Sequence, residues 1–597
     1  MSKPRRSARV PVSKPVLELR LSPMRLRILL GMIGIGFVVL TARATYLQTM
    51  RHEELQERGE KLYTREQSLP ASRGKILDRN GVVLASSLPA AAIVVDPQLF
   101  YDPPPTEPGQ EPSDRKGASA EQRRALARAL DMDTVALDQV IERGSRRFAY
   151  LKRQVDPVRA DEIMRLQVPG VSVRPEYKRH YPEGEVVSHV VGFTNYDDRG
   201  VEGIELAGDL RLRGVKGKRQ VMRDRRGQVI DDIRIVSNPI DGDDEQLSID
   251  SRLQYMTFAA LRDAFAQHQA LAGSVVVLDV QTAEVLALVN WPTYDPNDRK
   301  QLKRSSMRTR AITDRFEPGS TMKPFTTALA LELRKVTPNT VIETAPGYLK
   351  IGPDKIGDSH FLGTLTVAEV VQKSSNVGTA KIALDMPARQ MWEFLTALGF
   401  GQSPRVDFPG AVAGSLRPWR KWRPIEQATI SYGHGLSVTL LQLARAYLVL
   451  ARDGDLPELS LRRRAGPVAG RPILSTKTTM AIRDMIEAAA SLEGTGAKAM
   501  VTGYRVAGKT GTSLKQEHGH YVKKYVASFV GFAPVSAPRL LVAVMIDEPT
   551  SGKYYAGDVA APLFSRVMSD ALNLRRIAPD APVAEIEVPG PTAEARR

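Results

Sequence analysis

One apolar segment close to the N-terminus constrains this chain more than any other feature. Residues Leu26–Leu47 contain an uncharged core from Ile28 to Ala42, with Arg27 and Arg43 on either side. A helix of this length spans about 33 Å, enough to cross the hydrocarbon core of a bilayer. The two arginines can extend their charged ends toward the membrane interfaces. The sequence therefore predicts one transmembrane helix.

The charges around this segment predict its orientation. The first 27 residues carry eight basic residues and one acidic residue. By the positive-inside rule this tail stays in the cytoplasm, and the rest of the chain lies on the other side of the membrane. A cleavable signal peptide is the alternative, because the apolar core suits one and Ala42-Arg43-Ala44 resembles a cleavage site. We favour an uncleaved anchor, because a helical pattern continues through Tyr46–Glu66.

Composition excludes several classes of site and partner. The 597 residues are enough for two or more domains. The net charge is +17, but much of the excess lies in the N-terminal tail, and no nucleic-acid partner is expected. The absence of cysteine excludes disulfides, thiolate zinc sites and a cysteine nucleophile. No H-E-x-x-H zinc motif occurs, and His518-Gly519-His520 is predicted to be a solvent-exposed loop without a metal.

The stretch Phe316–Pro324 contains a pattern with chemical meaning, Ser320-Thr321-Met322-Lys323. Side chains three positions apart on a helix lie on one face, with Cβ atoms about 5–6 Å apart. A neutral Lys323 amine can therefore reach the Ser320 hydroxyl and act as its base. A helix beginning at Ser320 would also place partial positive charge where an oxyanion develops. Pro324 is compatible with the first helical turn.

The S-x-x-K pattern alone is not specific, since Ser113-Asp114-Arg115-Lys116 also has this form. Two later motifs make the pattern at Ser320 significant. Ser374-Ser375-Asn376 follows Thr366–Glu369, a capping box that begins a short helix. Lys509-Thr510-Gly511-Thr512 follows the strand-like segment Tyr504–Ala507. The order S-x-x-K, S-x-N, K-T-G-T resembles the penicillin-binding proteins and serine β-lactamases.

The motif residues suggest individual roles. A second cation close to Lys323 would disfavour its protonation, and Lys509 can be that cation and can also attract a carboxylate. Ser374 can relay a proton to a leaving nitrogen, and the amide of Asn376 can hold a substrate peptide group. Gly511 would let an extended peptide approach the strand edge closely. The resemblance implies an oxyanion hole made by the backbone N–H groups of Ser320 and Thr512. The predicted catalytic residues are Ser320, Lys323, Ser374, Asn376 and Lys509, and the predicted substrate-binding residues are Thr510, Gly511 and Thr512.

The region before residue 246 resembles the N-terminal module of class B penicillin-binding proteins. Arg73–Ala85 predicts a strand, an Asn-Gly turn and a second strand. Arg179-His180-Tyr181-Pro182 and Gly200–Glu205 match other signatures of that module, and structural roles are expected for both. Between Arg73–Ala85 and Arg179, Asp102–Gly117 is predicted to be a solvent loop and Ala118–Arg143 to be helical.

The remaining pattern predicts an α+β fold with one antiparallel sheet, completed by both ends of the domain and covered by helices on its faces. Ala283 occupies the turn position where the family usually has glycine. The predicted helices are Ser251–Gln267, Leu440–Ala451, which is apolar nearly all round, and Val559–Leu574. The predicted strands are Ser274–Val280, Glu284–Asn290, Tyr504–Ser513, Tyr525–Ala533 and Leu540–Ile546.

The resemblance runs from the membrane segment to about Leu574 and is nearest to the division-specific class B enzymes, which are peptidoglycan D,D-transpeptidases. It rests also on Gln372–Gly378, Tyr432-Gly433-His434-Gly435 and Gly552–Gly557, although His434 replaces an expected aromatic residue. It implies a serine acyl-enzyme formed on a stem pentapeptide ending in D-Ala-D-Ala, with release of D-Ala. β-Lactam antibiotics would acylate the same serine, and no metal or cofactor is implied.

The resemblance also implies a bacterial inner-membrane protein with one membrane span and a periplasmic catalytic domain. Its expected partners are a polytopic septal glycan polymerase and other membrane proteins of the division machinery. An elongation-specific transpeptidase, a catalytically silent septal scaffold, a β-lactamase and a penicillin-sensing receptor are the alternatives. The predicted parts are a cytoplasmic tail (1–25), a transmembrane anchor (26–47), an N-terminal pedestal or dimerisation module (48–245), a transpeptidase domain (246–577) and a disordered tail (578–597).

Overall fold

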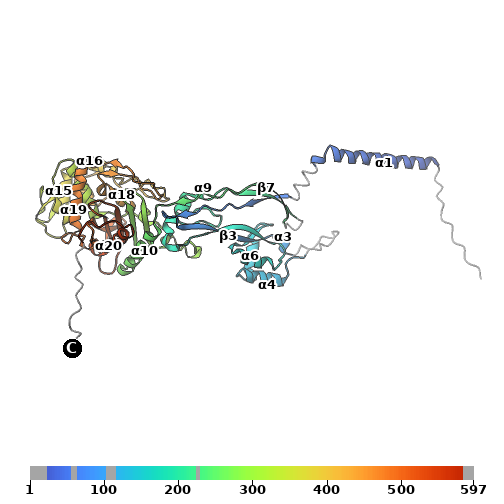
Figure 1. Ribbon diagram of the computed structural model, residues 1–597, viewed down its shortest axis with the longest axis horizontal. Helices are drawn as coiled ribbons and strands as arrows, with labels where there is room; N and C mark the ends of the chain where they lie inside the picture. The colour runs from blue at the N-terminus through green and yellow to red at the C-terminus, as the bar shows by residue number, and fades with distance from the viewer. Residues whose placement is uncertain (1–22, 55–63, 102–115, 224–228, 583–597) are drawn as a thin grey trace, which may run out of the picture. The chain divides into compact units, whose positions relative to one another are not determined.

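A computed structural model describes residues 23–54, 64–101, 116–223 and 229–582 (Figure 1). The chain divides into two compact units, each of which is described by itself. The first comprises residues 1–68 and 218–237, and the second comprises residues 69–217 and 238–597.

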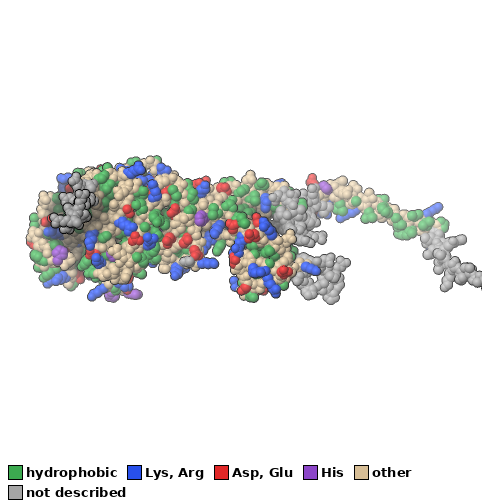
Figure 2. All heavy atoms as spheres, turned by 60° about the horizontal axis from the view of Figure 1, so that its bottom comes forward, with side chains coloured by type: hydrophobic (Ala, Val, Ile, Leu, Met, Phe, Trp, Pro, Cys, Tyr) green, Lys and Arg blue, Asp and Glu red, His purple; other side chains and the backbone are tan. Residues whose placement is uncertain are grey.

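The first unit contains the predicted apolar helix. Helix α1, Pro23–Thr49, is long and apolar enough to cross a membrane, with a mean hydropathy of 1.9 over its most apolar window. Hydrophobic side chains cover most of its surface in Figure 2, and none of its residues is buried. The predicted cytoplasmic tail lies almost wholly outside the described residues.

The prediction that the helical pattern continues to Glu66 is wrong. Strand β1, Thr64–Leu69, pairs with β6, Gly217–Arg223, and β6 pairs with β7, Val229–Ser237. A side-chain hydrogen bond also joins β6 to β1: Arg219 Nε donates to Gln67 Oε1 over 3.3 Å. Pairing with a segment some 150 positions away, which no local pattern reveals, decides the conformation here.

A sheet with the order β4-β3-β2-β8, in which β5 also pairs with β3, forms the centre of the N-terminal part of the second unit. The predicted Asn-Gly hairpin is confirmed, because Asp78 Oδ1 accepts from Asn80 N and Val82 N between β2 and β3. The strands are β2 (Ile76–Leu77), β3 (Val83–Val95), β4 (Ala149–Val155), β5 (Val171–His180) and β8 (Glu245–Gln246).

The predicted helix over Ala118–Arg143 is two helices, α4 (Ala120–Ala129) and α5 (Thr134–Glu142). Asp131 interrupts them with a left-handed φ of 58°, and Asp133 caps the second helix by accepting from Ala136 N. Aspartate favours such caps and turns over helix interiors. Most of the predicted loop before residue 118 lies outside the described residues.

The module signatures have the expected structural role. Glu205 is buried between two buried arginines and accepts from Arg73 Nε and Arg179 Nε, each over 2.6 Å. Tyr181, also buried, accepts from Thr194 N with its hydroxyl oxygen. The signatures thus form a desolvated ion cluster that joins strand β5 to the segment before β2 and to helix α8, Gly203–Ala207.

The C-terminal part of the second unit contains the predicted antiparallel sheet, in the order β10-β9-β19-β18-β17. Strands from both ends of the domain complete it, as predicted. The turn between β9 and β10 contains Ala283, which takes a left-handed φ of 54° in the place of the family's glycine. The strands are β9 (Ala272–Asp279), β10 (Val285–Trp291), β17 (Ala507–Glu517), β18 (His520–Ala533) and β19 (Leu540–Asp547).

Helices cover both faces of this sheet. Successive residues of β9 point alternately into two cores: Val275 packs with helices α10 (Ser251–His268) and α20 (Ala556–Leu574), and Val276 with helix α18 (Leu440–Ala451). Every residue of α18 except Arg445 is buried, as its apolar sequence predicted.

The prediction that a disordered tail begins at residue 578 is wrong for the described residues 578–582. The Asp580 carboxylate accepts from Arg505 N over 2.7 Å and from Ser536 N over 3.1 Å, and Ala581 N donates to Gly503 O. The chain therefore packs on the domain beyond Ala578, because a single acidic side chain satisfies two backbone donors there.

Candidate active site

Ser320 lies in a short 3-10 turn, η3 (Gly319–Met322), that leads into helix α13 (Lys323–Glu332). The predicted helix start is confirmed, with Pro324 in the first turn of α13. Ser320 is half-buried, whereas its neighbours Gly319 and Thr321 are buried. A partly exposed hydroxyl at a helix N-terminus is accessible to a substrate and lies in favourable potential for an oxyanion.

Lys323 is fully buried and is directed toward Ser374. Its Nζ donates to the Ser374 carbonyl and, over 3.1 Å, to Ser374 Oγ. Burial, assisted by the positive charge of Lys509, lowers the pKa of Lys323 well below its ordinary value, and Asp358 opposes this only weakly. Lys323 can therefore hold a neutral amine, while its expected contact with the Ser320 hydroxyl stays a prediction.

The S-x-N motif forms the connection between helices α14 (Val367–Gln372) and α15 (Asn376–Leu384). The predicted capping box at Thr366 and Glu369 is present at the start of α14. Ser374 adopts a left-handed φ of 61°, a strained conformation for serine that directs both its carbonyl and its hydroxyl toward Lys323.

Asp358, which the motif search missed, fixes this connection. Its carboxylate accepts from Ser375 Oγ over 2.7 Å, from Asn376 N and from Val377 N. The Asn376 side chain donates to Gly357 O over 3.1 Å, so in this structure one amide hydrogen is engaged within the protein. No spacing rule marks Asp358, because it directly follows a separate β-hairpin of strands β12 (Tyr348–Ile351) and β13 (Asp354–Gly357).

Lys509 and the rest of the K-T-G-T motif lie inside β17. Lys509 is fully buried, and its Nζ donates to Thr495 Oγ1 and Thr510 Oγ1, each over 3.3 Å. Burial lowers the pKa of Lys509 to about 7. Because β17 ends the described sheet order, its outer edge is available to pair with an extended peptide.

Gly511 has a packing role in addition to the substrate-binding role predicted for it. A Cβ at this position would come within 2.6 Å of Pro318 O and 2.7 Å of Ser528 Oγ. Glycine is therefore needed so that β17 can pack against the turn that carries Ser320. The constraint comes from the protein's own backbone, so the motif's glycine holds two parts of the site together.

The segment Tyr432–Gly435 packs against the same turn. Gly319 N donates to Gly433 O over 3.2 Å, and a Cβ on Gly433, whose φ is 88°, would meet Gly319 O at 2.1 Å. His434 lies next to Tyr432 and Tyr521, with ring centroids 5.3 and 6.0 Å away. Burial, with a contribution from Lys323, lowers the pKa of His434 to about 4, so the ring is neutral at ordinary pH.

Glu317 is a further residue that the sequence did not single out. Its carboxylate accepts from Gly435 N over 2.9 Å and from the Tyr521 hydroxyl over 3.0 Å. It thereby joins the turn before Ser320 to the Tyr432–Gly435 segment and to strand β18. Burial raises the pKa of Glu317, and these hydrogen bonds oppose that rise. An acid directly before a Pro-Gly turn was the available signal.

The described residues contain no group of three or more potential ligands that could hold a metal ion. The groups that the structure places at the site are a serine hydroxyl, two buried lysines, a second serine, an asparagine and a strand edge.

Comparison with known proteins agrees with this geometry. A family model for the penicillin-binding protein transpeptidase domain matches residues 273–569, and one for the penicillin-binding protein dimerisation domain matches residues 68–247. The chain is 40% identical over 586 residues to the probable peptidoglycan D,D-transpeptidase PenA of Neisseria gonorrhoeae, with 98% of each chain covered. It is 40% identical over 560 residues to the peptidoglycan D,D-transpeptidase FtsI of Escherichia coli K12, with 93% of each covered.

A solved structure of the transpeptidase domain of Burkholderia pseudomallei penicillin-binding protein 3 is 49% identical, with a TM-score of 0.53, and covers 56% of this chain and 98% of that one. The fold and the three motifs thus define a serine transpeptidase domain of the penicillin-binding type. With a dimerisation domain ahead of it and near full-length relatives, the chain belongs to the class B penicillin-binding proteins.

Proposed function

We propose that the protein is a peptidoglycan D,D-transpeptidase of the division septum in which Ser320 is the nucleophile and Lys323 its base. One observation carries this proposal: a fully buried lysine with a lowered pKa, bonded to Ser374, follows Ser320 by one turn. A neutral amine in this position can accept the proton of the attacking hydroxyl.

The first half-reaction is acylation. Ser320 Oγ attacks the carbonyl carbon of the penultimate D-Ala, and its proton passes to Lys323. The bond between that carbon and the nitrogen of the terminal D-Ala breaks, and Ser374 Oγ relays the proton from Lys323 to the departing nitrogen. The hydrogen bond of 3.1 Å between Lys323 Nζ and Ser374 Oγ supports this route.

The second half-reaction is transfer. The amino group of a neighbouring stem attacks the ester carbon and loses a proton, and Ser320 leaves with a proton restored. The product is an amide cross-link between two stems. A β-lactam acylates Ser320 in the same way, because its strained amide takes the place of the D-Ala-D-Ala bond.

Binding groups surround the nucleophile. Residues 510–512 on the open edge of β17 would pair with the stem as an added strand, and Lys509, with a pKa of about 7, would attract its carboxylate when protonated. Asn376 would hold a stem amide after exchanging its bond to Gly357 O. The backbone N–H groups of Ser320 and Thr512 would stabilise the oxyanion, each worth about 3–4 kcal/mol of barrier.

We infer that the N-terminus lies in the cytoplasm and the catalytic domain in the periplasm, because basic residues gather ahead of α1. The exposed surface of α1 supports contact with lipid and with another membrane protein, for which a polytopic septal glycan polymerase is the proposed partner, alongside other division proteins.

The experiment is to incubate the full-length protein with glycan strands bearing stem pentapeptides and to measure D-Ala release and cross-linked product. The wild type should form both, and Ser320→Ala neither. D-Ala release without cross-links would instead indicate hydrolysis. In cells, a fluorescent fusion should gather at mid-cell, whereas uniform labelling of the lateral wall would favour the elongation-specific alternative.

A further inference from the structure

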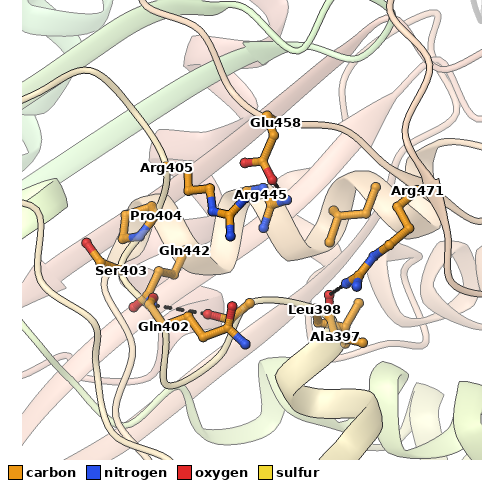
Figure 3. Close-up of a pocket in the computed structure, with 12 residues that line it drawn as sticks. Ala397, Leu398, Gln402, Ser403, Pro404, Arg405, Gln442, Arg445, Glu458 and Arg471 are labelled. Atoms are coloured by element: carbon orange, nitrogen blue, oxygen red, sulfur yellow. Dashed lines mark hydrogen bonds and ion pairs between the residues drawn. The ribbon is translucent and has the colours of Figure 1, made fainter.

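A cavity in the transpeptidase domain contains none of the three motifs (Figure 3). It has a volume of about 210 Å³ and lies between the end of helix α16 (Ala388–Ala397), the segment 398–405, helix α18 and the segment 456–471. Ligand pockets are commonly about 300–1,000 Å³, so this cavity is room for one charged group of a larger ligand.

Three arginines line this cavity against a single carboxylate. We call the three, Arg405, Arg445 and Arg471, the arginine pocket; the carboxylate is that of Glu458. Figure 3 shows Arg405 and Arg445 extending toward one another, with Arg471 entering from another segment of the chain. The lining therefore has an excess of positive charge.

Hydrogen bonds to other residues of the protein fix two of these guanidinium groups. Arg445, whose side chain is 13% exposed, donates from Nε to Pro457 O over 3.0 Å and from Nη2 to Glu458 over 3.2 Å. Arg471 donates from Nη2 to Ala397 O. Since a guanidinium has five N–H donors, these bonds orient each fork and leave further donors for a ligand.

The third arginine, Arg405, differs from these two. Arg405 is exposed, and within the described chain its side chain has neither a hydrogen bond nor an ion pair. Burial lowers the pKa of Arg445; Glu458 opposes this, while the charges of Arg471 and Arg405 add to it. The two exposed cations Arg405 and Arg471 thus repel the largely buried Arg445, and an incoming anion would relieve this repulsion through charge-assisted hydrogen bonds.

The backbone around the pocket is shaped for the Arg445 head group. Gly399 has a φ of 96°, and a Cβ there would meet Arg445 Nη1 at 2.9 Å. Next to it, Gln442 Nε2 donates to Gln402 O and, over 2.8 Å, to Ala413 O, which fixes the adjoining segment. The site is therefore held in place by secondary structure and side-chain bonds.

We propose that the arginine pocket is a second, non-catalytic binding site for an oxyanion of the cell-wall substrate. That oxyanion is a carboxylate of a muramyl peptide or a phosphate of the lipid-linked precursor. The ligand class rests on the proposed function, whereas the anion site itself rests on the three guanidinium groups. Bound there, a charged group would anchor a second part of a long substrate away from Ser320.

The test is isothermal titration calorimetry at low salt on the full-length protein in detergent, with Ser320 acylated by benzylpenicillin so that the active site is blocked. The probes are muramyl dipeptide, which carries a carboxylate, and inorganic pyrophosphate; N-acetylglucosamine is the uncharged control. We expect saturable binding of at least one anion, and the one that binds more tightly identifies the source. Salt should weaken the interaction.

Three substitutions decide the assignment. Arg405→Gln and Arg471→Gln should each weaken binding roughly tenfold, the effect of losing one charge-assisted bond. Glu458→Gln should tighten binding, because it removes the carboxylate that competes for Arg445. Arg304→Gln, which changes an exposed arginine outside the pocket, is the matched control and should leave binding unchanged.

The proposal is overturned if neither anion binds saturably, if Glu458→Gln weakens binding as Arg405→Gln does, or if Arg304→Gln has an equal effect. Melting temperatures of the variants exclude misfolding, and Arg405 has no partner whose loss would affect the fold. Benzylpenicillin acylation of the same samples tests the proposed function separately. Normal acylation without anion binding would reject the arginine pocket alone.

Discussion

The N-terminal module and the active site both bury cations, but the pKa shifts of cations in the two regions have opposite directions. In the module, Glu205 lies between Arg73 and Arg179, and although burial opposes it, pairing with Glu205 and Asp209 raises the pKa of Arg73. In the active site, Lys323 and Lys509 are buried without an ion pair in the described structure, and the pKa of each is lowered. A carboxylate partner therefore distinguishes the buried cations of the module from the two buried lysines of the proposed catalytic site.

The residue types fit these two uses. Arginine stays protonated and presents a planar fork to a carboxylate, whereas lysine gives up its proton readily when desolvated. The module thus keeps its arginines charged, whereas the candidate active site lowers the pKa of two lysines, of which Lys323 is the proposed base.

The largest effect should follow from removing the carboxylate in the module. Glu205→Gln leaves two buried guanidinium groups without their shared partner and should lower the free energy of unfolding by about 3–5 kcal/mol. Chemical denaturation of the full-length protein measures this free energy of unfolding. The matched control is Glu393→Gln, which breaks a pair exposed at the surface of α16 and should cost less than about 1 kcal/mol. Equal effects would show that burial is not the deciding factor.

Removing the base should have the next largest effect. Lys323→Ala should slow acylation by benzylpenicillin by about 10²–10⁴-fold, the range for loss of a general base. Stopped acylation reactions followed by mass spectrometry give the rate. Lys477→Ala, at an exposed position on helix α19 (Thr476–Ala490), is the control. A near-normal rate in Lys323→Ala would transfer the role of base to Lys509 or Ser374.

A smaller effect is expected from pH. The pKa of Lys509 is about 7 in the folded protein, below its ordinary value, so the unfolded chain binds more protons between pH 7 and about 10. Stability attributable to Lys509 should therefore rise with pH across this window, and it is lost as the pH falls toward 7. Urea unfolding of wild type and Lys509→Met at several pH values gives the difference. A flat difference would mean that Lys509 remains charged in the fold.

The smallest effect should come from the residue that departs from the family pattern. Because the pKa of His434 is about 4, its ring is neutral and fills the space of an aromatic residue. His434→Phe should change the acylation rate by less than roughly threefold between pH 6 and 8. A larger loss, or a new pH dependence, would assign His434 a direct role with substrate.

Sequence patterns predicted the elements that are determined by residues close together in the sequence. The capping box at Thr366, the apolar helix α18, the turn at Ala283 and the order of the three motifs each depend on neighbouring residues. The prediction of one antiparallel sheet completed by both ends of the domain followed from where strands occur along the chain, and the order of the strands came from the structure.

Contacts between distant segments could not be predicted in this way. Strand β1 is formed by pairing with β6, the tail beyond Ala578 is held by Asp580, and Gly511 is required by Pro318. Asp358 and Glu317 act through single hydrogen-bonded carboxylates that no spacing marks. The candidate site residues were thus predicted by motif, and the residues that position them required the structure.

The most direct test of the central claim is the intact mass of the protein after incubation with benzylpenicillin, for wild type and Ser320→Ala side by side. We expect one stable adduct on the wild type and none on Ser320→Ala, with both variants folded and membrane-bound. An adduct that persists in Ser320→Ala would contradict the assignment of the nucleophile. An adduct that forms and quickly disappears while penicillin is consumed would indicate a hydrolase instead of a transpeptidase.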